Sequence, residues 1–159
     1  MHTPGHLGLG FAGAAGIVLL LAVAGLSHLA VVASVLFVAL SPLPDVDEWL
    51  PWTAHRGGTH SVWFALAVGA GTALLAVLFG TALAVEPTTG ATLGFGVGFL
   101  AVALHVLADA FTPMGVYPLW PASTERRSLN VLASANPRAN RYALAGGLGL
   151  WLLTVGLVF

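Results

Sequence analysis

The sequence contains no cysteine and no lysine, and it has few charged residues of either sign. Without cysteine there are no disulfides, no thiolate metal sites and no cysteine nucleophile. All five basic residues are arginines and the formal net charge is -1, which excludes nucleic-acid binding by a basic face. Only 7% of the 159 residues are charged and 58% are hydrophobic, whereas soluble domains carry about 25% charged residues. The composition therefore indicates an integral membrane protein.

Long apolar runs predict an all-α, polytopic membrane protein. A helix needs about 20 apolar residues to cross a bilayer. The runs predict a bundle of about five transmembrane helices within a single domain over residues 1–159, at residues 7–26, 28–43, 61–85, 92–111 and 142–159. No lysine or arginine precedes Arg56 and the first run is as long as a true span, so we expect it to be a retained helix and not a cleaved signal peptide.

The polar segments between these runs alternate between the two ends of the predicted bundle. The N-terminus, residues 41–60 and residues 112–141 fall at one end, whereas two short connections and the C-terminus fall at the other. The first end carries all of the arginines, which are Arg56, Arg126, Arg127, Arg138 and Arg141. Because positively charged loops stay in the cytoplasm, we expect a plasma-membrane protein with a cytoplasmic N-terminus and an external C-terminus.

The acids and histidines gather at this arginine-bearing end. His105 and Asp109 are four residues apart, so they share one face of the fourth helix. Ionisable groups within a membrane helix are costly and usually mark function. In and just before the segment LPDVD, Pro42 and Pro44 predict extended backbone before Asp45, which Asp47 follows two residues later. The two carboxylates then point to different partners, so that one ligates a metal while the other orients a histidine or bridges a second ion.

Three more histidines lie at the same end. His6 opens the first helix, and His55 and His60 precede the third helix in the segment HRGGTHS. Imidazole is the commonest metal ligand near neutral pH. Arg56 lies between the last two histidines, where we expect it to contact a lipid phosphate or a substrate anion. Each motif alone also fits a structural role, such as a helix cap, a buried hydrogen-bonded pair or an arginine that anchors the chain.

Together these residues predict a metal site. The candidate ligands are His6, Asp45, Asp47, His55, His60, His105 and Asp109. A mixed His/Asp set favours zinc, with manganese or iron(II) as alternatives, and seven candidates are enough for one or two ions. A divalent ion lowers the pKa of bound water toward about 7. Asp47 or Asp109 is then the candidate base, and Arg56 the candidate cation for the developing negative charge.

The same motifs resemble a family of small integral membrane proteins described as membrane-bound metal-dependent hydrolases, one bacterial member of which is controlled by the SOS repressor. The similar segments cover nearly the whole chain and are Gly5-His6, LPDVD, HRGGTHS, HVLAD with TPMGV, and LWP. The resemblance implies a hydrolase whose functional set is the seven candidate ligands. The His-x-x-x-Asp element is also similar to the zinc-dependent phospholipase C and nuclease fold, which favours a phosphoester substrate. Related sequences lead us to expect an acidic residue near Asn140.

We therefore expect a metal-dependent hydrolase that acts on a lipid or lipid-linked phosphoester at the cytoplasmic interface, with membrane lipid as its partner. The lysine motif of phosphatidic-acid-type phosphatases, the zincin His-Glu-x-x-His and the Gly-x-Ser-x-Gly of serine hydrolases are absent. Two alternatives stay open, a metal or proton transporter and a non-catalytic, metal-stabilised membrane regulator. The sequence does not define an oligomeric state.

Overall fold

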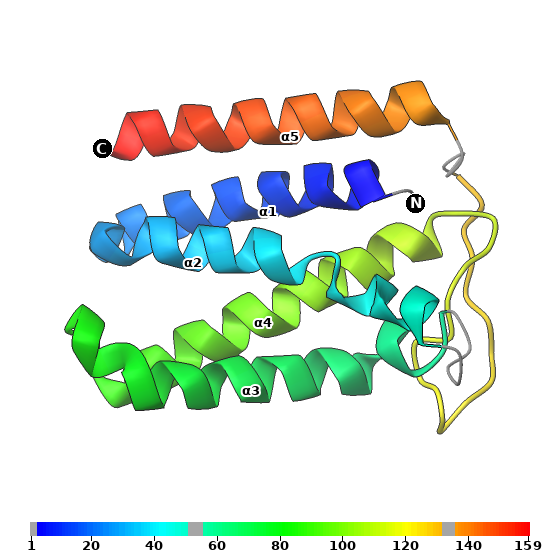
Figure 1. Ribbon diagram of the computed structural model, residues 1–159, viewed down its shortest axis with the longest axis horizontal. Coiled ribbons are helices and arrows are strands. Elements are labelled where there is room, and N and C mark those ends of the chain that lie inside the picture. The colour runs from blue at the N-terminus through cyan, green and yellow to red at the C-terminus, as the bar shows by residue number, and fades with distance from the viewer. Residues whose placement is uncertain (1–2, 51–55, 132–135) are drawn as a thin grey trace.

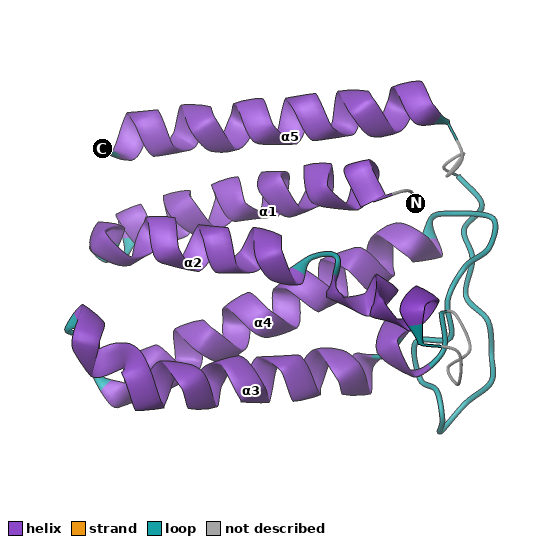
Figure 2. Ribbon diagram, in the orientation of Figure 1, coloured by secondary structure: helices purple, strands orange, loops and turns teal. Residues whose placement is uncertain are grey.

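The structure is a computed structural model that describes residues 3–50, 56–131 and 136–159. These residues form helices and connecting loops, with no strand beyond an isolated antiparallel bridge between Val116 and Arg127 (Figure 2). Five helical segments are long and apolar enough to cross a membrane. The elements in chain order are α1 (Thr3–Val23), α2 (Ser27–Leu40), η1 (Leu43–Trp49), η2 (Gly58–His60), α3 (Val62–Phe79), η3 (Gly80–Leu83), α4 (Pro87–Ala110) and α5 (Pro137–Val158).

The predicted all-α, five-span architecture is confirmed, and the long helices run roughly side by side. α5 lies along α1, α3 lies along α4, and α2 packs between these two pairs (Figure 1). The N-terminus and the C-terminus lie at opposite ends of the bundle (Figure 1). The polar segments between α2 and α3 and between α4 and α5 lie at the N-terminal end, as predicted. The buried apolar core is built from small and medium side chains of α1, α2 and α4, such as Ala14, Val18 and Ala101.

Three predicted helix boundaries were wrong because each helix starts earlier. α1, α4 and α5 begin at Thr3, Pro87 and Pro137, not at residues 7, 92 and 142. The last two begin with proline, which reads as a loop signal in a sequence but suits the first turn of a helix, where no amide hydrogen is needed. Asn140, predicted to lie in a loop, is therefore inside α5 and buried.

Side-chain caps explain these two early starts. The Asn136 side chain accepts hydrogen bonds at the start of α5. At the start of α4, the Glu86 carboxylate accepts hydrogen bonds from the backbone N–H groups of Thr88 and Thr89, both at 2.9 Å. These bonds lower the pKa of Glu86 to about 2, because they stabilise its ionised form. The caps satisfy amides that have no partner within the helix.

The second and third predicted helices end early. α2 stops at Leu40 and α3 stops at Phe79, short of residues 43 and 85. The segment LPDVD, predicted to be extended, is the 3₁₀ helix η1. The φ angle that proline imposes also suits the first turn of a helix, and Pro44 occupies that position in η1. This compact turn places Asp45 beside His105 of α4 and Asp47 beside His60.

Small residues allow the two closest helix pairs to touch backbone to backbone. Gly8 of α1 faces Gly147 of α5, and a Cβ atom built on either glycine would collide with the main chain of the other helix. Between α3 and α4, the Thr72 hydroxyl donates to the Gly94 carbonyl at 2.7 Å. In lipid, such close packing and interhelical hydrogen bonds hold helices together, since lipid tails are as apolar as the helix surfaces.

Candidate metal centre

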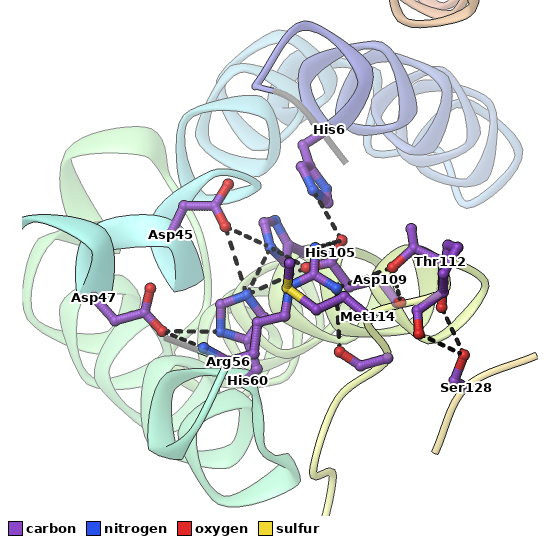
Figure 3. A network of polar contacts seen from close by, with 12 residues as sticks. His6, Asp45, Asp47, Arg56, His60, His105, Asp109, Thr112, Met114 and Ser128 are labelled. Atoms are coloured by element: carbon purple, nitrogen blue, oxygen red, sulfur yellow. Dashed lines mark hydrogen bonds and ion pairs between the residues drawn. The ribbon is translucent and has the colours of Figure 1, made fainter. Parts of the chain in front are cut away.

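Four ionisable residues converge at the N-terminal end of the bundle. They come from three elements: His6 from α1, Asp45 from η1, and His105 and Asp109 from α4 (Figure 3). Each offers one nitrogen or oxygen atom, and these four atoms lie within 4.8 Å of one another. His6, His105 and Asp109 are buried, whereas the side chain of Asp45 is 17% exposed. The cluster therefore opens to solvent beside Asp45.

His105 is held in one orientation by the chain around it. Its Nδ1 atom lies 2.8 Å from the Ser41 carbonyl oxygen, to which it donates a hydrogen bond in the tautomer that leaves Nε2 unprotonated. Its Nε2 atom lies 3.2 Å from Asp45 Oδ1 and 3.7 Å from Asp109 Oδ2. The ring also stacks on His6, with the centroids 3.8 Å apart and the planes 12° apart. A carbonyl on the far nitrogen is the usual support of a metal-binding histidine.

His60 adds a fifth donor to this group. Its Nε2 atom lies 3.2 Å from His105 Nε2, 3.4 Å from Asp109 Oδ2 and 3.5 Å from Asp45 Oδ1. Burial by itself lowers the pKa of His60, but the three surrounding carboxylates outweigh burial and hold that pKa above its ordinary value. The Nε2 atom thus faces a concentration of negative charge.

Asp47 lies on the far side of the His60 ring. Its Oδ2 atom is 3.2 Å from His60 Nδ1 and also accepts hydrogen bonds from the Arg56 backbone N–H at 2.9 Å and the Thr59 hydroxyl at 2.7 Å. This position fits the role of orienting a histidine, one of the two roles considered for the second carboxylate of LPDVD. Thr59 and Ser61 of HRGGTHS are both candidate caps of α3 in the sequence; Ser61 is the cap, and Thr59 holds Asp47 instead.

Arg56 is buried and points into the protein. Its Nη2 atom donates to Asp109 Oδ1 at 3.1 Å, and its Nη1 atom donates to the Thr112 hydroxyl and the Gly115 carbonyl at 2.9 and 3.1 Å. Its own φ is 63°, a left-handed conformation rare for a residue with a side chain. The guanidinium therefore balances the buried charge of Asp109 and ties α4 to the loop that follows it.

The donor set suits a divalent cation. Three imidazoles and two carboxylates without sulfur match zinc, manganese or iron(II). Within the described residues, the Nδ1 atom of buried His6 has no hydrogen-bond partner, and its Nε2 atom is 3.3 Å from Asp109 Oδ1. Such a concentration of buried ionisable groups is costly in a membrane protein without a compensating charge.

The family model of the YdjM inner membrane protein matches residues 1–159. The chain belongs to this family. It is the family of the SOS-regulated bacterial member that the motifs resemble. No curated protein and no solved structure matches the chain. Membership together with the apolar helices makes this YdjM family member a multi-pass inner-membrane protein.

The structure brings together five of the seven predicted ligands. Asp47 is not part of the cluster but contacts the Nδ1 atom of His60. His55 lies outside the described residues. At the position where an acid was expected, the Asn140 amide donates to the Asn136 carbonyl at 2.8 Å. The sequence analysis missed the Ser41 carbonyl and the Thr112 hydroxyl, because main-chain acceptors and single hydroxyls leave no recognisable motif.

Proposed function

We propose that this YdjM family member is a membrane-embedded metal-dependent hydrolase that cleaves a lipid or lipid-linked phosphoester at the cytoplasmic interface. The observation that carries the proposal is the convergence of His6, Asp45, His105 and Asp109 within 4.8 Å. These residues come from segments as far apart as α1 and α4, so the cluster is a product of the whole fold.

The same four residues, with His60, are the ones we propose to hold the ion, which is zinc or, as alternatives, manganese or iron(II). When bound, such an ion makes a water ligand acidic and neutralises negative charge on a phosphoryl group. The mixture of nitrogen and oxygen donors matches that of catalytic zinc sites.

The remaining roles follow from exposure and hydrogen bonding. The sequence suggested Asp47 or Asp109 as the base, but both side chains are buried, whereas Asp45 reaches solvent. We therefore assign to Asp45 the acceptance of a proton from water. Asp47 positions His60 through Nδ1. Arg56 donates to the Asp109 carboxylate and holds it in place, which makes it a positioning residue here instead of a cation that meets substrate.

Aromatic side chains support a substrate at headgroup depth. Four of them are exposed around the end of the bundle that holds the cluster: Trp49, Trp63, Trp120 and Tyr142. Tryptophan and tyrosine concentrate at the boundary between lipid tails and water. At that depth the cluster meets the phosphate groups of lipids and not their tails.

Transport fits less well because the half of the bundle away from the cluster has no buried ionisable side chain among the described residues. The buried polar side chains described there are Ser34, Thr72 and Thr154, and each donates to main-chain carbonyls. None is ionisable, so they offer no relay of sites for an ion. A purely structural metal site would close its coordination shell, whereas Asp45 is open to solvent.

The proposal is tested by the metal content of the purified protein. Plasma mass spectrometry of the wild type is expected to find about one or two divalent ions per chain, and the His105→Ala, Asp109→Ala double variant is expected to lose them. His28→Ala is the matched control, since His28 is exposed at the opposite end of α2. The metal-loaded wild type, but not the double variant, is then expected to release phosphate from lipid phosphomonoesters. Protein that stays metal-free after reconstitution with zinc, manganese and iron(II) would contradict the proposal.

A further inference from the structure

A groove of about 340 Å³ runs along the side of the bundle between α1 and α4. Its α1 wall is formed by Gly13, Gly16 and Leu20, and its α4 wall by Leu100 and other apolar residues of that helix. All of its lining side chains are apolar, and its walls belong to membrane-spanning segments. Leu20 and Leu100 are exposed at its rim, so the groove opens toward lipid.

The groove reaches the depth of the metal centre. Leu107, on its α4 wall, lies between His105 and Asp109 in the sequence. On α1, His6, Gly13 and Leu20 are spaced by seven residues, so they share one face of the helix. The cluster residue His6 therefore stands on the same helix face as the groove, two turns above Gly13.

The size and the apolar lining of the groove limit the kinds of molecule that can occupy it. An apolar cavity of this kind stays dry, so water does not fill it. A helix about 10 Å across occupies about 800 Å³ over a 10 Å length, which is more than twice the groove. A single hydrocarbon chain fits, since the distance along α1 from Gly13 to Leu20 is about 10 Å.

We propose that this groove binds one hydrocarbon chain of the substrate and so presents the phosphoester of a membrane amphiphile to the cluster. The statement about substrate rests on the proposed function, whereas the statement about chain binding does not. The other large groove, about 330 Å³ between α2, α3 and α4, does not serve this purpose. Its α4 wall ends at Val97, about two turns before His105, whereas the α4 wall of the first groove extends to Leu107, beyond His105.

Gly16 offers a direct way to fill the groove. A Cβ atom added to Gly16 meets no atom within 4 Å, so a larger side chain enters the groove without displacing the fold. Gly71 of α3 is the matched control, because it is exposed, its Cβ also meets nothing within 4 Å, and it lines neither groove. Gly16→Leu and Gly71→Leu thus make the same chemical change on two lipid-facing surfaces.

The test measures retention of hexadecyl phosphate and of butyl phosphate by the detergent-solubilised, chelator-treated protein, using native mass spectrometry. We expect the wild type and Gly71→Leu to retain hexadecyl phosphate equally. Gly16→Leu is expected to bind it at least about tenfold more weakly, with Gly16→Ala between the two. Binding of butyl phosphate is expected to be the same for all four proteins.

Two outcomes overturn the inference: equal retention of hexadecyl phosphate by Gly16→Leu and Gly71→Leu, or no retention by the wild type. The thermal midpoint of each variant reports whether it is folded, and the graded Gly16→Ala variant keeps the test decisive if Gly16→Leu is not. Because the metal is removed, chain binding is measured apart from hydrolysis. Failure of the metal-loaded wild type to release phosphate would therefore count against the proposed function alone.

Discussion

The two ring nitrogens of His60 face different carboxylates, and this difference gives Asp47 its role. Nδ1 lies against Asp47, which also accepts hydrogen bonds from Arg56 and Thr59, while Nε2 points into the cluster. We therefore expect Asp47 to select the tautomer and the orientation of the His60 ring without being a ligand of the proposed ion.

Asp47→Asn is expected to weaken metal affinity by about 10–100-fold while the protein stays folded, because an amide orients His60 less strongly than a carboxylate. Competition with a chelating dye measures the affinity. Glu125→Gln is the control, since Glu125 forms an exposed ion pair with Arg127 in the loop after α4. Equal affinities of Asp47→Asn and wild type would rule out this role.

The burial of Arg56 changes the role that the sequence suggested for it. An arginine beside two histidines in the sequence suggested contact with a substrate anion. In the fold, its guanidinium is buried and its terminal nitrogens bond Asp109, Thr112 and Gly115. We therefore propose that this enclosed charge stabilises Asp109 and does not meet the substrate.

At the scale of elements, the contact of α1 with α5 decides whether His6 reaches the cluster. That contact depends on Gly8 and Gly147, whose backbones touch. A side chain at either position would push the helices apart and shift the N-terminal turn of α1, which carries His6. We therefore expect the glycines of this interface to hold His6 in place, although neither glycine belongs to the candidate metal centre.

Gly147→Val is expected to destabilise the protein by about 1–3 kcal/mol, the range typical of overpacked contacts. Gly149→Val is its control, because a Cβ atom at Gly149 meets nothing within 4 Å. Thermal unfolding in detergent compares the two variants, and metal content shows whether the cluster is disturbed. Similar unfolding midpoints for both variants would show that α1 and α5 do not depend on this contact.

At the scale of the whole molecule, the arginines and the cluster share one end of the bundle. Arg138 and Arg141 lie in the first turns of α5, and the remaining arginines lie in or beside the loops at that end. The short connection between α3 and α4, at the opposite end, carries the acid Glu86 and no basic residue. This asymmetry is what orients a multi-pass protein in its membrane.

We therefore expect the C-terminus outside the cell and the cluster on the cytoplasmic side. Alkaline phosphatase fused after Phe159 is expected to be active, since that enzyme folds only in an oxidising compartment. A fluorescent protein fused at the same position is expected to be dark. The reverse pattern would place the metal centre on the outer face and contradict a cytoplasmic substrate.

Local information in the sequence was enough for the five spans and for the end at which each polar segment lies. The length of each apolar run predicts a span, because a span must be long and apolar whatever packs against it. Because successive spans cross the membrane in opposite directions, their order places each polar segment at one end of the bundle. The predicted starts of the fourth and fifth helices were wrong, because both helices begin at a proline, Pro87 and Pro137. The side chains of Glu86 and Asn136 cap these starts. The i, i+4 pair of His105 and Asp109 was likewise readable, since one helix sets its geometry.

The sequence by itself determined that this is a helical membrane protein with its acids and histidines at one end. Only the tertiary structure decided which of them meet. Asp45 enters the cluster and Asp47 does not, because the 3₁₀ turn η1 points them to opposite sides of His60. His105 is oriented by a carbonyl 64 residues away. Contacts between distant segments arise from helix packing, and no local pattern of residues encodes them.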